Sequence, residues 1–216
     1  MRGKVAAGAA LGTLGLGLWV GDGNAVTGPD RSLADAVTGG LARQHGLLEL
    51  FVQPTEPYVL LPLIALMTLL CALGRHWRGA LLCVAGTAIP VALNSWVLKP
   101  VFDRHLKDYL AYPSGHTVSL VAVLTVLVLL ARPGTGRLVA GALAVLVTAV
   151  AGVGLVGLGY HYPIDVAGGA LFAVAAVLGV SLSVSFLPVP RRAPERSDGS
   201  PPGGTSSGSP PATSPR

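Results

Sequence analysis

Charged residues are scarce in this chain of 216 residues. Only 12% of its residues are Asp, Glu, Lys or Arg, whereas an ordinary soluble domain carries about 25%. Apolar residues account for 51% of the sequence, and the mean hydropathy is +0.64. This composition excludes an ordinary soluble domain and predicts an integral membrane protein.

Cysteines and clusters of basic residues are also sparse. The two cysteines, Cys71 and Cys83, lie inside apolar runs without metal-ligand spacing, so we expect neither a disulfide framework nor a metal site. The net charge is +5, but the basic residues are scattered over short segments and form no stripe that would neutralise a nucleic-acid backbone. The sequence therefore predicts no metal, no cofactor and no nucleic-acid partner.

Long apolar runs dominate the rest of the sequence. Backbone groups within lipid must form their hydrogen bonds internally, and a helix of roughly 20 residues spans a bilayer. The fold class is therefore predicted as all-α, a polytopic membrane bundle of about six transmembrane helices. The runs cover residues 5–20, 57–74, 79–98, 115–131, 138–158 and 165–187.

These runs divide the chain into three predicted segments. Residues 1–56 hold the first span and an outer loop, residues 57–187 form the core, and residues 188–216, rich in Pro, Ser, Gly and Arg, form a disordered cytoplasmic tail. We expect the first run to remain as a span. Its basic start and the small residues at 23–25 also fit a cleavable signal peptide, which would leave five spans.

The outer loop has a helical pattern of its own. Apolar residues recur there at approximately helical spacing among polar ones, which predicts an interfacial amphipathic helix broken near Gly39-Gly40; a plain surface loop is the alternative. The apolar residues are Leu33, Val37, Leu41, Leu47, Leu48 and Phe51.

Lysine and arginine set the expected orientation, because they favour the cytoplasmic side of a membrane. With the N-terminus inside, ten of them fall on inner segments and five on outer ones. Residues 99–114 and 159–165 then both face outside. We therefore expect a multi-pass protein of the cell membrane with its functional loops on the extracytoplasmic side.

Polar residues gather in these two outer segments. Residues 113–116, Pro-Ser-Gly-His, open an apolar run, and such a helix start presents free backbone N–H groups to an anion. His161 lies four residues before Asp165, so the carboxylate is expected to fix the imidazole tautomer and leave the other nitrogen free as a nucleophile. The alternatives are that His116 anchors the membrane interface, that Asp165 only caps the last helix, and that His161 belongs to an interfacial belt.

The order of Lys99, Pro-Ser-Gly-His and His-x-x-x-Asp resembles the type 2 phosphatidic acid phosphatase (PAP2) superfamily over about residues 57–187. The resemblance implies an integral membrane lipid phosphatase that forms a phosphohistidine without a metal. It implies His161 as nucleophile, His116 as general acid and Asp165 as orienting partner, with phosphate bound by Lys99, Arg104, Ser114 and Gly115.

Two arginines of that family are missing from their expected places. Leu106 stands where the first motif has Arg, so Arg104, two residues earlier, is the expected substitute and Lys107 a weaker one. Gly154 and Leu155 replace the Ser-Arg pair of the third motif, with no evident substitute. Because loss of one transition-state cation can slow a reaction by orders of magnitude, a slow enzyme, an unusual substrate and a catalytically dead relative all stay open.

The leading hypothesis is a phosphatase for polyprenyl phosphate, polyprenyl diphosphate or phosphatidate, with the lipid entering sideways from the membrane. A phosphotransferase on the same scaffold and a non-catalytic lipid-binding protein are the alternatives. The charged side chains of Asp103, His105 and Asp108 are expected to be solvated loop charges. The sequence leaves the particular lipid and the oligomeric state open.

Overall fold

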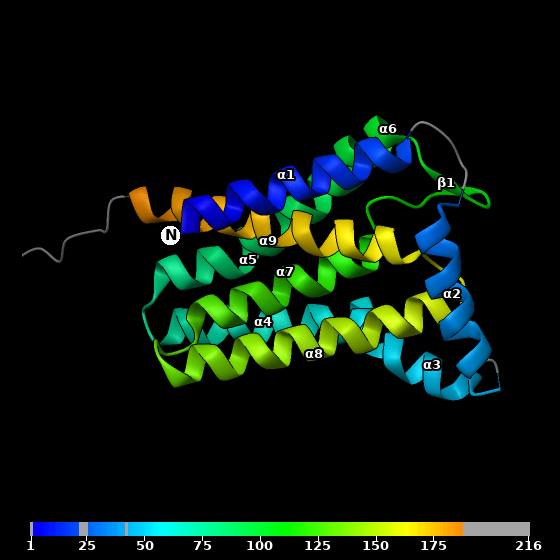
Figure 1. Ribbon diagram of the computed structural model, residues 1–216. Coiled ribbons are helices and arrows are strands. Elements are labelled where there is room, and N and C mark those ends of the chain that lie inside the picture. The colour runs from blue at the N-terminus through cyan, green and yellow to red at the C-terminus, as the bar shows by residue number, and fades with distance from the viewer. Residues whose placement is uncertain (1, 22–25, 42, 188–216) are drawn as a thin grey trace, which may run out of the picture.

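The structure is a computed structural model that describes residues 2–21, 26–41 and 43–187. Helices dominate this part of the chain, so the predicted all-α class is confirmed (Figure 1). The predicted tail and the candidate cleavage site at 23–25 lie outside the described residues.

The elements follow one another along the chain in a simple order. The α-helices are α1 (Arg2–Gly21), α2 (Gly28–Leu41), α3 (His45–Val52), α4 (Pro57–Leu73), α5 (Trp77–Leu93), α6 (Lys99–Phe102), α7 (Gly115–Leu130), α8 (Thr135–Gly157) and α9 (Pro163–Phe186). A 3-10 turn (Gln53–Thr55) precedes α4, and a π-helical turn (Asn94–Leu98) joins α5 to α6. Strands β1 (His105–Leu106) and β2 (Tyr109–Leu110) pair antiparallel as a hairpin.

Each predicted apolar run forms a helix, and five stretches are long and apolar enough to cross a membrane: Arg2–Gly21, His45–Leu73, Trp77–Phe102, Thr135–Gly157 and Pro163–Phe186. Helix α7, which forms at the remaining predicted run, has 16 residues. At 1.5 Å per residue it is about 24 Å long, which is less than a hydrocarbon core of about 30 Å. The chain is a multi-pass membrane helix bundle with a shorter helix among its spans.

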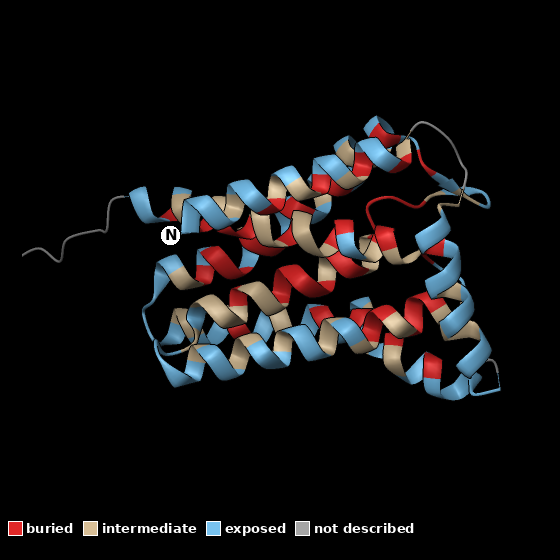
Figure 2. Ribbon diagram, viewed as in Figure 1, coloured by how far each residue is buried: buried red, intermediate tan, exposed pale blue. Residues whose placement is uncertain are grey.

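Helix α7 lies inside the bundle, where it packs against α5, α8 and α9. Its residues Val118, Ala122 and Val126 are completely buried. Large apolar side chains on α8, such as Leu138 and Leu146, are instead exposed. Much of the α8 ribbon is accordingly pale blue in Figure 2. This distribution suits a lipid surrounding, because outward-facing leucines are then in an apolar solvent.

One end of the bundle carries the hairpin, α2 and α3, and we call it the hairpin end (Figure 1). Helix α2 runs across the ends of α8 and α9 there. The segment is helical and is broken near Gly39-Gly40 as predicted: α2 includes both glycines and ends at Leu41, and α3 begins at His45. The paired glycines lie in the last turn of α2, where they weaken the helix close to its end.

Helix α3 packs closely against the last turns of α8. A side chain at Gly154 would meet the backbone oxygen of Leu48 at 2.9 Å, and one at Gly157 would meet the Leu48 side chain at 2.7 Å. The two glycines therefore let α3 approach the backbone of α8. This contact fixes the part of α8 that leads into the loop before α9.

Candidate active site

A polar cavity of about 330 Å³ opens at the hairpin end. Four of the seven predicted site residues line it: His161, His116, Lys99 and Gly115. The other three, Asp165, Arg104 and Ser114, are buried and do not line it. The lining is completed by Thr55, Pro57, Val91, Asn94, Ser95, Tyr109 and Ser119.

Ser114 begins α7 as its N-cap. Its hydroxyl oxygen accepts hydrogen bonds from the Thr117 backbone N–H (3.3 Å) and hydroxyl (3.0 Å). Its own backbone N–H donates to the Asp165 carbonyl oxygen at 3.0 Å. The hydroxyl thus stabilises the helix start and does not line the cavity as predicted, because it is turned to the first turn of α7.

Gly115 leaves open space above that first turn. A Cβ atom placed there would meet only the Asn94 Nδ2 at 3.9 Å and the Lys99 Nζ at 4.0 Å. The open space therefore lies between an amide, an ammonium and the N-terminus of a helix, where N–H groups lack intrahelical acceptors. These are the features of an anion site.

Two side chains from the α5–α6 region frame this space. Lys99 donates from Nζ to the Leu110 carbonyl oxygen at 2.7 Å, which ties the hairpin to the cavity. Asn94 donates from Nδ2 to the Pro113 carbonyl oxygen at 3.4 Å, while its buried Oδ1 has no partner within the described ranges. Sequence reasoning missed Asn94. The signal that could have found it was a single amide side chain near the end of an apolar run, and the structure places this residue in a π-helical turn.

The two histidines face each other across the cavity. Their ring centroids are 5.8 Å apart; the His116 ring is stacked with Tyr160, and the His161 ring meets Tyr109 edge-on. His161 is only 4% exposed. Burial, helped by the neighbouring His116 and Lys99, lowers the pKa of His161 to about 3. Its imidazole is therefore neutral near pH 7 and has a nitrogen lone pair available for attack.

Asp165 lies behind His161 in the first turn of α9. Its Oδ2 accepts from the Tyr162 backbone N–H at 2.9 Å, which caps the helix. His161 Nδ1 is 3.9 Å from the same Oδ2 and has no hydrogen-bond partner among the residues described. The expected pair is adjacent, but the gap exceeds a hydrogen bond by about 1 Å. Catalytic hydrogen bonds are often long before substrate binds.

Arg104 occupies a different place from the one predicted. Its Nη1 donates to Asp165 Oδ1 at 2.8 Å and its Nη2 to Asp30 Oδ2 at 2.7 Å, with the guanidinium over the Tyr162 ring. Arg104 therefore does not reach the cavity to replace the family's arginine, because two carboxylates hold it in the interior. Lys107, the weaker candidate, is exposed on the hairpin and does not line the cavity either.

Asp30 of α2 was also missed from the sequence. Thr27 and Asp30 have the spacing of a helix start, and the Asp30 backbone N–H does donate to the Thr27 hydroxyl at 3.2 Å. Nothing in that spacing points to an arginine 74 residues further along the chain. By contrast, Asp103, His105 and Asp108 are exposed and lie outside the cavity lining.

Leu155, the second departure from the family pattern, is completely buried. Its carbonyl oxygen accepts from the backbone N–H groups of Tyr160 (2.9 Å) and His161 (3.3 Å). The end of α8 thus positions the loop that carries His161. The neighbouring Gly154 is in contact with α3, as described above. Closely packed residues therefore fill this region, where the family pattern has a cation.

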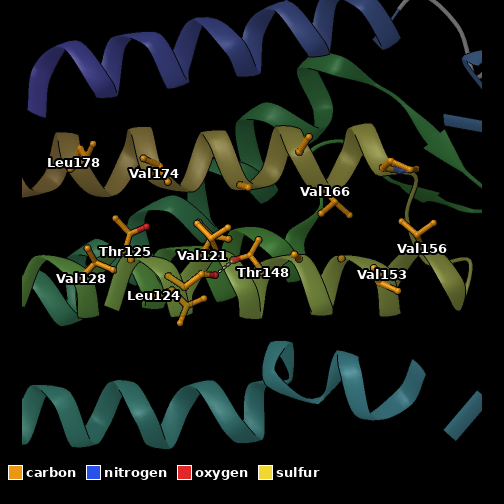
Figure 3. A pocket seen from close by; sticks show the side chains of 18 of the residues that line it. Val121, Leu124, Thr125, Val128, Thr148, Val153, Val156, Val166, Val174 and Leu178 are labelled. Carbon is orange, nitrogen blue, oxygen red and sulfur yellow. Dashed lines mark hydrogen bonds between the residues drawn. The ribbon is translucent and has the colours of Figure 1, made fainter. Parts of the chain in front are cut away.

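Two apolar cavities lie along the helices. One of about 510 Å³ runs between α4, α5 and α7 and shares five lining residues with the polar cavity, so the two lie side by side. A larger one of about 700 Å³ is lined by α7, α8 and α9 and by Leu33 and Val37 of α2 (Figure 3). The shared residues are Thr55, Pro57, Val91, Ser95 and Ser119.

Comparisons with known proteins agree with this architecture. Residues 95–187 match the family model of the PAP2 superfamily, which confirms the resemblance that the motifs predicted. The fold is similar to that in "Crystal structure of the first transmembrane PAP2 type phosphatidylglycerolphosphate phosphatase from Bacillus subtilis", with a TM-score of 0.69 and 20% sequence identity over 88% of this chain and 100% of that one. No curated protein matched the chain significantly.

Proposed function

We propose that this protein is a membrane lipid phosphatase that acts through a phosphohistidine on His161. The observation that carries the proposal is a buried, neutral imidazole that shares one cavity with a second histidine, a lysine and an open helix N-terminus. Phosphoryl transfer needs mainly positioning and stabilisation of the phosphoryl oxygens, and these groups provide both.

In the first step, Nε2 of His161 attacks phosphorus and the bond to the leaving oxygen breaks. His116, which the negative charge of the bound phosphate favours in its protonated form, gives its proton to that oxygen as it leaves. Asp165 accepts a hydrogen bond from Nδ1–H and stabilises the positive charge of the phosphohistidine. Lys99 and the backbone N–H groups at the start of α7 hold the phosphoryl oxygens, so the mechanism uses no metal.

In the second step, water attacks the phosphohistidine. His116, now neutral, takes a proton from the water while the phosphorus–nitrogen bond breaks, which releases inorganic phosphate and neutral His161. With a diphosphate substrate, the leaving group of the first step is the lipid monophosphate. The cycle returns both histidines to their starting protonation states.

The adjoining polar and apolar cavities support a lipid as substrate. A phosphate in the polar cavity would place an attached hydrocarbon chain in the 510 Å³ apolar cavity, whose walls include Leu60, Ile64 and Val123. At the opposite end of the bundle, Arg75 lies between α4 and α5, and Arg78 lies in the first turn of α5. The positive-inside rule assigns that end to the cytoplasm, and the site therefore to the extracytoplasmic side.

Phosphate release by the detergent-purified protein tests the proposal. The substrates are polyprenyl diphosphates, polyprenyl monophosphates and phosphatidates, assayed in EDTA. We expect metal-independent release that is lost in His161→Ala and retained in His76→Ala, an exposed histidine between α4 and α5. Release that needs a metal or survives His161→Ala would exclude the phosphohistidine. No release from any lipid would favour a non-catalytic lipid-binding protein.

A further inference from the structure

Asp30 is a completely buried carboxylate on a helix that the reaction does not use. Its Oδ1 accepts the backbone N–H of Ile164 at 2.9 Å, and its Oδ2 accepts Arg104 Nη2 at 2.7 Å. Ile164 lies in the first turn of α9, one residue before Asp165. The carboxylate therefore joins α2 both to Arg104 and to the helix that carries Asp165.

A buried carboxylate is expensive unless its charge is paired and its oxygens are hydrogen-bonded. Asp30 meets both conditions, and so does Arg104, whose two terminal nitrogens each face one carboxylate. Two such contacts fix the plane of the guanidinium fork in a way that a single contact does not. The position of Asp165 Oδ1 therefore depends on where Asp30 holds Arg104.

The two carboxylate oxygens of Asp165 have different partners. Oδ1 accepts from Arg104, and Oδ2 accepts from the Tyr162 backbone and lies 3.9 Å from His161 Nδ1. Rotation of the carboxylate would change the second distance as well as the first. A contiguous set of contacts thus runs from Asp30 through Arg104 and Asp165 to His161.

We propose that Asp30 is a positioning residue: through Arg104 it sets the orientation in which Asp165 faces His161. This role rests on the proposed phosphohistidine mechanism for its effect on turnover, although the geometry itself does not depend on it. It explains why Arg104, although displaced from the family position, is held inside the protein. It also gives α2 a part in catalysis, although α2 contributes no residue to the lining of the polar cavity.

Asp30→Asn tests the proposal, because the amide oxygen can still accept from Ile164 while the charge facing Arg104 is lost. A misplacement of about 1 Å caused by a change away from the reacting atoms can cost about 100-fold in rate. We expect kcat for the lipid substrate to fall about 10- to 100-fold and KM to stay within about two-fold, since no cavity residue changes. The matched control is Asp35→Asn, an exposed carboxylate on the same helix, which should retain wild-type kcat.

Nitrogen-15 NMR of histidine-labelled protein gives a readout that needs no turnover. We expect His161 to be mainly the Nδ1–H tautomer in the wild type and a mixture of tautomers in Asp30→Asn, with Asp35→Asn unchanged. If the wild type releases no phosphate, the proposed function fails and the tautomer shift alone decides the role of Asp30.

A folded Asp30→Asn protein with wild-type kcat and an unchanged His161 tautomer would overturn the proposal, as would a loss confined to KM. If Asp30→Asn does not fold, the double variant Asp30→Asn/Arg104→Gln carries the same test, because it removes the buried cation together with the carboxylate of Asp30 and leaves Asp165 its hydrogen bond from the Tyr162 backbone. It should show the same loss of kcat and the same tautomer mixture. Wild-type values in the folded double variant would equally overturn the role.

Discussion

Gly169 lies outside the polar cavity, but one methyl group added there should displace residues of the site. It lies on α9 against the start of α7, and a Cβ atom there would meet the Ser114 carbonyl oxygen at 2.8 Å and the Thr117 Cβ at 3.2 Å. The oxygen belongs to the backbone that precedes Gly115 and His116, so no side-chain rotation can relieve the clash. Gly169→Ala should therefore push the start of α7 away by about 0.5 Å.

The size of the effect follows from a comparison on the same helix. A Cβ atom at Gly179 of α9 would meet nothing within 4 Å, so Gly179→Ala should bring only the gain in helix propensity, about 1 kcal/mol. Gly169→Ala brings the same gain and adds an overpacking cost of about 1–3 kcal/mol. The difference between the two variants isolates the clash at about 1–3 kcal/mol.

Thermal unfolding in detergent and the phosphatase assay measure the two consequences. A difference of 1 kcal/mol shifts Tm by about 2–4 °C in a chain of this size, so Gly169→Ala should melt about 2–12 °C below Gly179→Ala. Since a 1 Å misplacement can cost about 100-fold in rate, a shift of half that size should lower kcat about 10-fold. Equal Tm values, or a destabilised Gly169→Ala with full kcat, would refute the reasoning.

Two further predictions concern the charges of the cavity. Lys99→Met should lower kcat/KM about 10²- to 10³-fold, as does loss of one oxyanion donor, whereas Lys107→Met on the exposed hairpin should stay within about two-fold in the same phosphate-release assay. The unfolding free energy should fall as the pH falls from about 6.5 towards 3, because burial lowers the pKa of His161 to about 3 while the unfolded chain takes up a proton near 6.5. At His161 the unfolded state binds more of the proton throughout that window, so the contribution of this histidine to stability rises with pH by up to a few kcal/mol. Denaturant titrations at a series of pH values should show that the unfolding free energy of His161→Gln depends less on pH than that of the wild type. An unchanged pH dependence would contradict the assignment.

The sequence predicted the long helices well because lipid imposes one rule on every span. Backbone hydrogen bonds must close within the segment, so apolar runs alone located α1, α4, α5, α7, α8 and α9. The outer loop obeys no such rule. Its helical pattern was visible, and the glycines at 39 and 40 indicated a break, which the structure places directly after them, between Leu41 and His45.

The candidate site was predictable where residues are near in sequence and unpredictable where they are not. His161 and Asp165 are four residues apart, and residues 114–116 lie at the start of one helix, so local spacing indicated that the members of each group lie close together. Arg104 has partners 74 and 61 residues away, and no spacing encodes such contacts. Asn94 entered the site because the π-helical turn and the start of α7 meet, which is again a tertiary contact.

The two departures from the family pattern have a common structural cause. The segment that joins α1 to α4 supplies both Asp30, which holds Arg104 in the interior, and α3, which packs on Gly154 beside Leu155. A charged side chain at 155 would have to be buried there, since that position is completely enclosed. Among the described residues, Lys99 is then the one lysine or arginine that lines the polar cavity. In the proposed mechanism, binding of a phosphate therefore depends on this ammonium and on the N–H groups of α7. The same mechanism requires a neutral His161, because its lone pair attacks while one cation holds the phosphoryl oxygens.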